Sequence, residues 1–211
     1  MIVRTFGIVL CALLTGCQIQ FNSEIYAQDV FSDENLTFPA QLKLEINSCT
    51  SGTRSKTDNA VLALFSSVAK AKIRGCEEVG MNSMLAVDFA AQLASTPSEY
   101  DLVLLRERAE DGSVELRMSL DSTFLSRVRS LLKENHQSLD YDDVSIRFTL
   151  HNDERNPVSV SIISGWLNGQ AGQHLTTTLN RREKVEILSS NVVSALTLKE
   201  QNPLILVLRK E

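Results

Sequence analysis

The stretch VSIRFTLHNDERNPVSVSII, residues 144–163, decides the fold of the C-terminal part of the chain. Val144, Ile146 and Phe148 alternate with polar residues, and a polar turn through Pro157 leads to a second alternating run. Alternation of apolar and polar residues is typical of strands that bury one face. We therefore predict two strands in this stretch, joined by that turn.

The residues that follow repeat this pattern at short intervals. Asn168-Gly169 is a strong signal for a tight turn after Trp166. Closely spaced short strands are typical of an antiparallel sandwich or a sheet extension. We expect a hairpin of strands 175–179 and 183–188 joined through 180–182, a short helix near 191–195 and a last strand over 204–208.

The N-terminal part mixes strands and helices. Leu42 and Leu44 alternate with polar residues and predict a strand, with Pro39 at its start or at an edge position. Apolar residues at helical spacing predict a helix capped by Thr57 or Asp58 and a second one capped by Asp121. Further strands are expected over 72–77, 84–93, 102–106 and 114–120, the last two joined at 110–112.

These elements predict an α+β fold with an α+β region over 36–138 and a mostly antiparallel, sandwich-like β region over 139–211. A single fused domain over 36–211 is the alternative, because each region is small for an independent core. Residues 17–35 are expected to form a tether, of which the apolar part docks on the body.

The composition excludes several classes of protein. The 211 residues are 43% hydrophobic and 22% charged, as in ordinary globular proteins. The net charge of -5 argues against a basic surface for nucleic acid. After the first fifteen positions no apolar run reaches the length of a spanning helix, about 18–20 residues. A disordered chain, a nucleic-acid-binding protein and a multi-pass membrane protein are therefore not expected.

The first residues carry the most specific motif. Arg4 precedes the apolar run from Phe6 to Leu14, which ends in Leu14-Thr15-Gly16-Cys17. This motif resembles the lipobox of bacterial lipoproteins. The resemblance implies a signal peptide over 1–16, lipidation of Cys17 with diacylglycerol and fatty acid such as palmitate, and anchoring in a membrane. An ordinary secretory signal with a chance cysteine, or a buried N-terminal strand, is the alternative.

The resemblance also bears on the compartment. Gln18 follows Cys17, and aspartate at this position retains lipoproteins in the inner membrane of enterobacteria. We therefore expect a protein anchored in the outer membrane of the cell envelope, on its periplasmic face or at the surface.

The remaining cysteines fit an exported protein. With Cys11 removed in the signal peptide and Cys17 lipidated, Cys49 and Cys76 remain, and an even remainder in an exported chain predicts one disulfide. The bridge would be worth roughly 3 kcal/mol. A metal site and a reactive thiol are the alternatives, although two cysteines without a nearby histidine make a poor zinc site.

Other candidate sites carry little chemistry. The chain lacks the common hydrolase, zinc-protease and phosphate-loop motifs. Its histidines, His136, His151 and His174, have no partner spacing, and the carboxylates of 140–143 lack the pattern of a calcium loop. We expect no catalytic residues, no cofactor and no metal. Trp166 is expected to pack in or at the margin of the core, and an exposed aromatic anchor for a partner is the alternative. The basic side of the second helix (Arg127, Arg129, Lys133) faces solvent or, alternatively, anionic lipid.

The C-terminal pattern adds a looser resemblance. The strand-turn-strand through Pro157, the run 158–164, Asn168-Gly169 and the segment 189–196 look like a group of uncharacterised lipoproteins of bacteria and their prophages. The early strand ending at Cys49 also fits. This group implies no activity for particular residues.

Together these observations predict a non-enzymatic, lipid-anchored binding or accessory protein of an envelope complex, with an envelope protein as its partner. A prophage-encoded exclusion lipoprotein that masks a surface receptor is the first alternative. An envelope hydrolase built on dispersed carboxylates is the second, because glycoside hydrolysis needs only two such groups.

Overall fold

The computed structural model describes residues 19–46, 48–49, 59–60, 63, 71–79, 82–96, 100, 102–134 and 144–211. The strands are β1 (Ile19–Tyr26), β2 (Leu36–Ile46), β3 (Lys72–Val79), β4 (Asn82–Ala94), β5 (Leu102–Arg108), β6 (Val114–Leu120), β7 (Val144–His151), β8 (Val158–Leu167), β9 (Gln170–Leu179), β10 (Lys184–Ser189) and β11 (Leu204–Lys210). The helices with defined bounds are α1 (Ala27–Phe31), α3 (Ser122–Glu134) and α4 (Asn191–Leu198).

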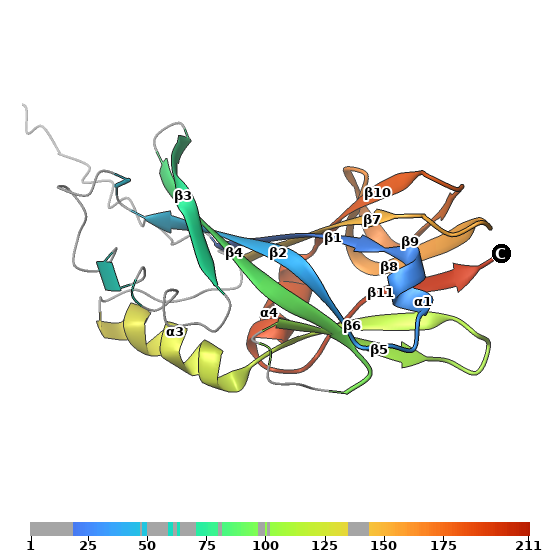
Figure 1. The fold of residues 1–211 in the computed structure, drawn as a ribbon, viewed down its shortest axis with the longest axis horizontal. Coiled ribbons are helices and arrows are strands. Elements are labelled where there is room, and N and C mark those ends of the chain that lie inside the picture. Colours follow the sequence, from blue (N-terminus) through green and yellow to red (C-terminus); the bar gives the residue numbers. More distant parts are fainter. Residues whose placement is uncertain are drawn as a thin grey trace, which may run out of the picture.

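Nine of the strands close into a barrel (Figure 1). The order around the ring is β10-β7-β1-β2-β4-β5-β6-β11-β8, and β8 returns to β10. β3 extends the sheet from β4, and β9 extends it from β8. The prediction of an α+β, sandwich-like fold is therefore wrong, because the strands of both predicted regions join one closed, mostly β structure with short helices.

The alternation of apolar and polar residues in the sequence does predict which face of these strands is buried. In β6 and β7 every second residue is buried and points into the barrel. Inward side chains from the strands of the ring meet in one apolar cluster that includes Leu42, Leu104, Met118, Phe148 and Ile162. A barrel of this size has an interior that side chains fill. The cluster therefore serves as the hydrophobic core.

β1 is the strand that joins the two predicted regions. It pairs antiparallel with β2 and parallel with β7, so that Phe21 lies between Leu42 and Ile146. Its inward residues Ile19, Phe21 and Ile25 are buried. Residues 19–35, expected as a tether that docks in part, therefore form a strand of the wall and α1. The strands on the two sides of the expected boundary also pair with each other, since β6 pairs with β11.

β8 changes partner along its length, and this change closes the ring. Residues 158–162 pair with β11, whereas Gly165, Trp166 and Leu167 pair with Ser189, Leu188 and Ile187 of β10. Gly165 marks the change with a φ of 150°. The buried face also shifts here, from Ile162 to Gly165 and Leu167. Trp166 is half-buried as a result, which agrees with the expectation of core or half-core packing and not with an exposed anchor.

The C-terminal hairpin is also paired differently from the prediction. β9 pairs with β8 through the turn at Asn168-Gly169, whose φ angles of 48° and 80° are typical of a type I′ turn. β10 pairs with β7 and with the end of β8. Strands 175–179 and 183–188 thus do not form a hairpin, and residues 180–182 connect two strands that lie apart in the sheet.

Two short helices lie at opposite ends of the barrel (Figure 1). α1 follows the end of β1 and buries Ala27 and Val30 completely. α4 lies at the level where β1 and β7 begin, because the hydroxyl of Ser194 donates to the carbonyl oxygen of Val144 at 2.9 Å. We call these two ends the α1 end and the α4 end.

The predicted disulfide is confirmed. Cys49, just after β2, is bonded to Cys76 in β3, with 5.3 Å between their Cα atoms. Pro39 lies inside β2 and not at its start. Its carbonyl oxygen accepts from the Ser23 hydroxyl at 2.9 Å, where the β1–β2 ladder ends, so its missing N–H leaves no ladder bond unmade.

The second predicted helix is confirmed as α3. The Asp121 carboxylate accepts from the backbone N–H of Phe124 at 2.7 Å and caps the helix. Of the first predicted helix, after Thr57 or Asp58, only residues 59, 60 and 63 are described, and these are helical. No helix of the described residues is long and apolar enough to cross a membrane.

Candidate functional site

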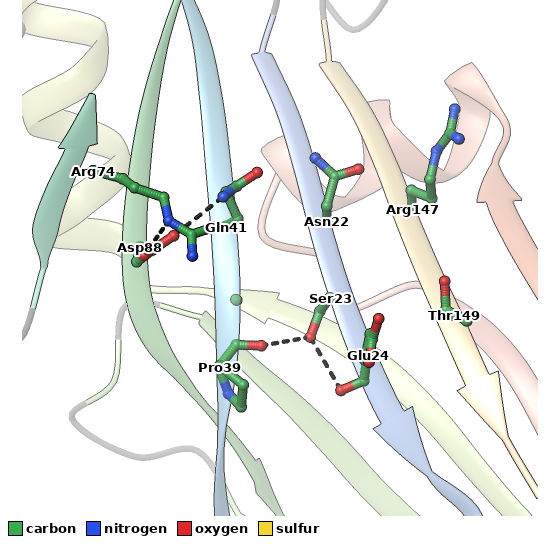
Figure 2. Close-up of a pocket in the computed structure, with 10 residues that line it drawn as sticks. Asn22, Ser23, Glu24, Pro39, Gln41, Arg74, Asp88, Arg147 and Thr149 are labelled. Atoms are coloured by element: carbon green, nitrogen blue, oxygen red, sulfur yellow. Dashed lines mark hydrogen bonds and ion pairs between the residues drawn. The ribbon is translucent and has the colours of Figure 1, made fainter. Parts of the chain in front are cut away.

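An open polar hollow lies on the outer face of the barrel wall (Figure 2). Its volume is about 460 Å³, and β1, β2, β3, β4 and β7 contribute to its lining. The lining residues are Asn22, Ser23, Glu24, Pro39, Ala40, Gln41, Arg74, Asp88, Arg147 and Thr149. We call this feature the wall hollow.

The register of the strands places four of these residues in one row. Asn22 lies beside Arg147 of β7 on one side and beside Gln41 of β2 on the other, and Gln41 lies beside Asp88 of β4. The neighbouring residues Phe21, Leu42 and Val87 point inward and are buried. Since side chains alternate along a strand, the four polar side chains all point outward.

Hydrogen bonds fix the β4 side of the row. The Gln41 side-chain amide donates to Asp88 at 3.2 Å, and the Arg74 guanidinium lies 3.5 Å from the other Asp88 oxygen (Figure 2). On the β7 side, Arg147 pairs with Glu186 of β10 at 3.0 Å. The two arginines are therefore held at opposite margins of the wall hollow.

The centre of the row is open to a ligand. Among the described residues, the Asn22 amide and the Thr149 hydroxyl make no side-chain hydrogen bond, so their donors and acceptors face solvent. The lining holds two guanidinium groups and two carboxylates, those of Asp88 and Glu24, and it contains no aromatic ring. Such a surface suits a polar ligand of little net charge that offers amide-like donors and acceptors, and it offers no stacking face for a sugar.

The α1 end carries a second group of polar contacts. Arg106 is 5% exposed and donates to the carbonyl oxygens of Asp29 at 3.2 Å and of Glu34 at 3.0 Å. Burial raises the pKa of the Asp29 carboxyl, and the charge of Asp153 raises that pKa further. These contacts hold α1 and the residues after it against β5.

The predicted candidate residues do not come together. His151 stacks on Tyr26 with 5.0 Å between ring centres, and its Nε2 lies 3.5 Å from Glu24. His174 is exposed in β9. His136 and the carboxylates of 140–143 lie outside the described residues, as does Cys17. Within the described part of the chain, no three His, Cys, Asp or Glu side chains gather as metal ligands. The expectation of no catalytic residue and no cofactor stays a prediction.

Asn152 and Arg129 make polar contacts that serve the fold. Asn152, in the turn between β7 and β8, is fully buried, and its amide donates to the carbonyl oxygens of Leu179 and Asn156 at 2.7 and 3.1 Å. On α3, Arg129 donates to the carbonyl oxygen of Leu198 and lies 3.7 Å from Glu200. α3 is thereby joined to the end of α4.

A family model described as a domain of unknown function, DUF7424, matches residues 19–211. The chain belongs to the DUF7424 family. The DUF7424 match starts at the first residue of β1 and covers every strand of the barrel, so the closed ring with β3 and β9 is the DUF7424 fold in this chain. No protein among the curated sequences matches it.

Sequence reasoning did not find the wall hollow of this DUF7424 domain. The signal was present as outward polar positions in three separate segments, around Asn22, Gln41 and Arg147. Alternation indicates that each points away from the core, but it does not reveal which strands are neighbours. The parallel β1–β7 pairing brings Asn22 and Arg147 together, and nothing local in either segment predicts it.

Proposed function

We propose that this protein is a lipid-anchored, non-enzymatic binding or accessory protein of the bacterial cell envelope, with the wall hollow as its binding surface. One observation carries the proposal. The lipobox-like Leu14-Thr15-Gly16-Cys17 ends two residues before the point where both β1 and the family match begin. The folded domain thus begins after the proposed cleavage site, so cleavage before Cys17 would leave the domain whole.

The disulfide supports the same compartment. Cys49 and Cys76 are bonded, and disulfides persist in exported proteins and are rare in the reducing cytosol. The outer membrane is the proposed destination because Gln18 takes the place of the aspartate that retains lipoproteins in the inner membrane. Anchoring also assists binding, since a ligand confined to the same surface is met at a high effective concentration.

The wall hollow supports binding in preference to hydrolysis. It is open, Asp88 is already held by Arg74 and Gln41, and Glu24 lies 3.5 Å from His151. A glycoside hydrolase needs a pair of carboxyl groups that flank the scissile bond, one of them with a raised pKa. The open amide and hydroxyl of Asn22 and Thr149 offer hydrogen bonds to a partner.

The test is purification of the anchored protein from native membranes in mild detergent, with mass spectrometry of the proteins that remain bound. We expect a stoichiometric envelope protein with wild type. Asn22→Arg, which fills the wall hollow, should lower its recovery about tenfold, equivalent to 1.4 kcal/mol. Gln173→Arg introduces the same side chain on exposed β9, away from the hollow, and should leave recovery unchanged. A monomer without partners, or equal losses with both variants, would contradict the proposal.

The anchor is tested separately. Cys17→Ser should release the protein from the membrane fraction or leave it as an unprocessed precursor. If the variant fractionates as a mature membrane protein, the lipobox interpretation is wrong.

A further inference from the structure

The distance between the proposed lipid and the barrel constrains how the protein stands on a membrane. Two residue steps separate Cys17 from Ile19, and they span at most about 7 Å. Ile19 is held in the wall between Leu44 and Val144. A lipid on Cys17 therefore leaves little freedom for the domain to move away from the bilayer.

The strand that carries the anchor runs from one end of the barrel to the other. From Ile19 to Tyr26, β1 has seven steps, which correspond to about 23 Å of strand and to about 18 Å along the axis of a barrel with ordinary strand tilt. Val144 is level with Ile19, and α4 bonds to Val144 through Ser194. The α4 end is thus next to the lipid, and the α1 end is beyond its reach.

The α4 end carries exposed basic groups that an anionic membrane surface would attract. Exposed basic residues lie on α3 and after α4, namely Arg127, Arg129, Lys133 and Lys199, against the acidic residues Glu134 and Glu200 of the same segments. Arg129 joins α3 to the end of α4. At the other end, α1 and the residues after it carry Asp29, Asp33 and Glu34, and the side chains of Arg106, Arg108 and Lys210 lie against this segment. Anionic lipid attracts basic groups near its surface and repels carboxylates.

The apolar surface differs as well. Val192, in the first turn of α4, is 63% exposed, more than any other large apolar residue of the described chain. An exposed valine beside a lipid anchor gains by contact with the interfacial region of a bilayer.

We infer that the α4 end of the barrel lies on the membrane surface and contacts anionic lipid headgroups, while the α1 end points away from the membrane. This inference rests on the proposed lipidation of Cys17. The wall hollow then faces sideways, with Asn22 three strand residues, about 10 Å of strand, beyond Ile19. A partner in the wall hollow would approach along the membrane plane.

Three positions test this orientation in the full lipidated protein. Val192→Cys reports on the α4 end, Tyr26→Cys reports on the α1 end, where Tyr26 is 40% exposed, and Thr149→Cys reports on the wall hollow. Each variant is labelled with an environment-sensitive fluorophore and reconstituted in phosphatidylcholine vesicles that contain phosphatidylglycerol and a nitroxide lipid. Quenching should be several-fold stronger at Val192 than at the other two positions.

Other results would overturn the inference. Equal quenching at Val192 and Tyr26 would mean a freely tumbling domain, and strongest quenching at Thr149 would mean that the barrel lies on its side. The double variant Arg127→Glu with Lys133→Glu should weaken quenching at Val192 only in vesicles with phosphatidylglycerol. Unchanged quenching in these vesicles would show that the two residues do not contact anionic headgroups.

A linker variant and a mass measurement separate this inference from the proposed function. About twelve Gly and Ser residues inserted between Gln18 and Ile19 span roughly 19 Å and should reduce quenching at Val192 to the level of Tyr26. The mass of the N-terminal peptide reports lipidation independently. Without lipid on Cys17 both proposals fail, whereas lipid on Cys17 with equal quenching refutes the orientation alone.

Discussion

Gly165 is the position at which a single methyl group should open the barrel. A Cβ built there would lie 2.3 Å from the carbonyl oxygen of Leu188 and 3.3 Å from the backbone N of Ser190, so the obstruction is backbone that cannot rotate away. The φ of 150° adds strain for any residue with a side chain. Both the clash and the strain would act at the place where three pairs of residues join β8 to β10 and close the ring.

The expected cost of Gly165→Ala follows from these two effects. The strained backbone conformation costs about 1–3 kcal/mol. Separation of the strands would also remove one or two ladder hydrogen bonds of about 1 kcal/mol each. We therefore expect the free energy of unfolding to fall by about 2–5 kcal/mol, a large share of the 5–15 kcal/mol typical of a domain.

Two other glycines provide matched controls for chemical denaturation followed by circular dichroism. Gly112 has a φ of 80° but open space around its Cβ position, so Gly112→Ala should cost about 1 kcal/mol. Gly75 has open space and no positive φ, so Gly75→Ala should change stability by no more than about 0.5 kcal/mol. A Gly165→Ala variant that is no less stable than Gly112→Ala would refute the reasoning.

Three further substitutions test other parts of the structure. Arg106→Met removes two charged hydrogen bonds to the segment after β1 and should lower the free energy of unfolding by about 2–4 kcal/mol in thermal unfolding. Arg108 is exposed, so Arg108→Met should cost at most about 1 kcal/mol. Similar losses in the two variants would show that the buried contacts of Arg106 do not hold this segment in place. Burial and Asp153 raise the pKa of Asp29, so its ionised form is disfavoured in the fold and stability is lost as pH rises from 3.8 through the raised pKa. Asp29→Asn should therefore stabilise the protein above that window and have no such effect below pH 3.8, and denaturation at several pH values that finds the same difference throughout would contradict this assignment. Cys49→Ala should lower the free energy of unfolding by about 3 kcal/mol under oxidising conditions and leave one free thiol at Cys76; two free thiols in the exported wild type would disprove the bridge.

Local patterns in the sequence predicted the strands and the β5–β6 hairpin, but they did not predict which other strands are neighbours. Alternation identified β6 and β7, Asp111-Gly112 and Asn168-Gly169 identified two turns, and Asp121 identified the start of α3. These features depend on a few adjacent residues. The parallel β1–β7 pair joins segments more than a hundred residues apart, and no adjacent residues encode it.

Trp166 illustrates the same limit within one strand. Its parity with Val158, Val160 and Ile162 predicts a core or half-core position and does not decide between the two. The kink at Gly165 moves the buried face to Leu167 and leaves Trp166 half-buried. The kink depends on the approach of β10, which is a tertiary contact. The wall hollow was missed for this reason too, since its row exists only once β7, β1, β2 and β4 are neighbours.

The central claim is that a lipid on Cys17, the first residue of the mature chain, holds the folded domain directly on a membrane. The mass of the N-terminal peptide of the native protein tests this claim most directly. The account predicts a mature chain that begins at Cys17 and carries a thioether-linked diacylglycerol, with Cys49 and Cys76 still bonded. A chain that begins at Met1, or one cut elsewhere with an unmodified Cys17, would contradict it.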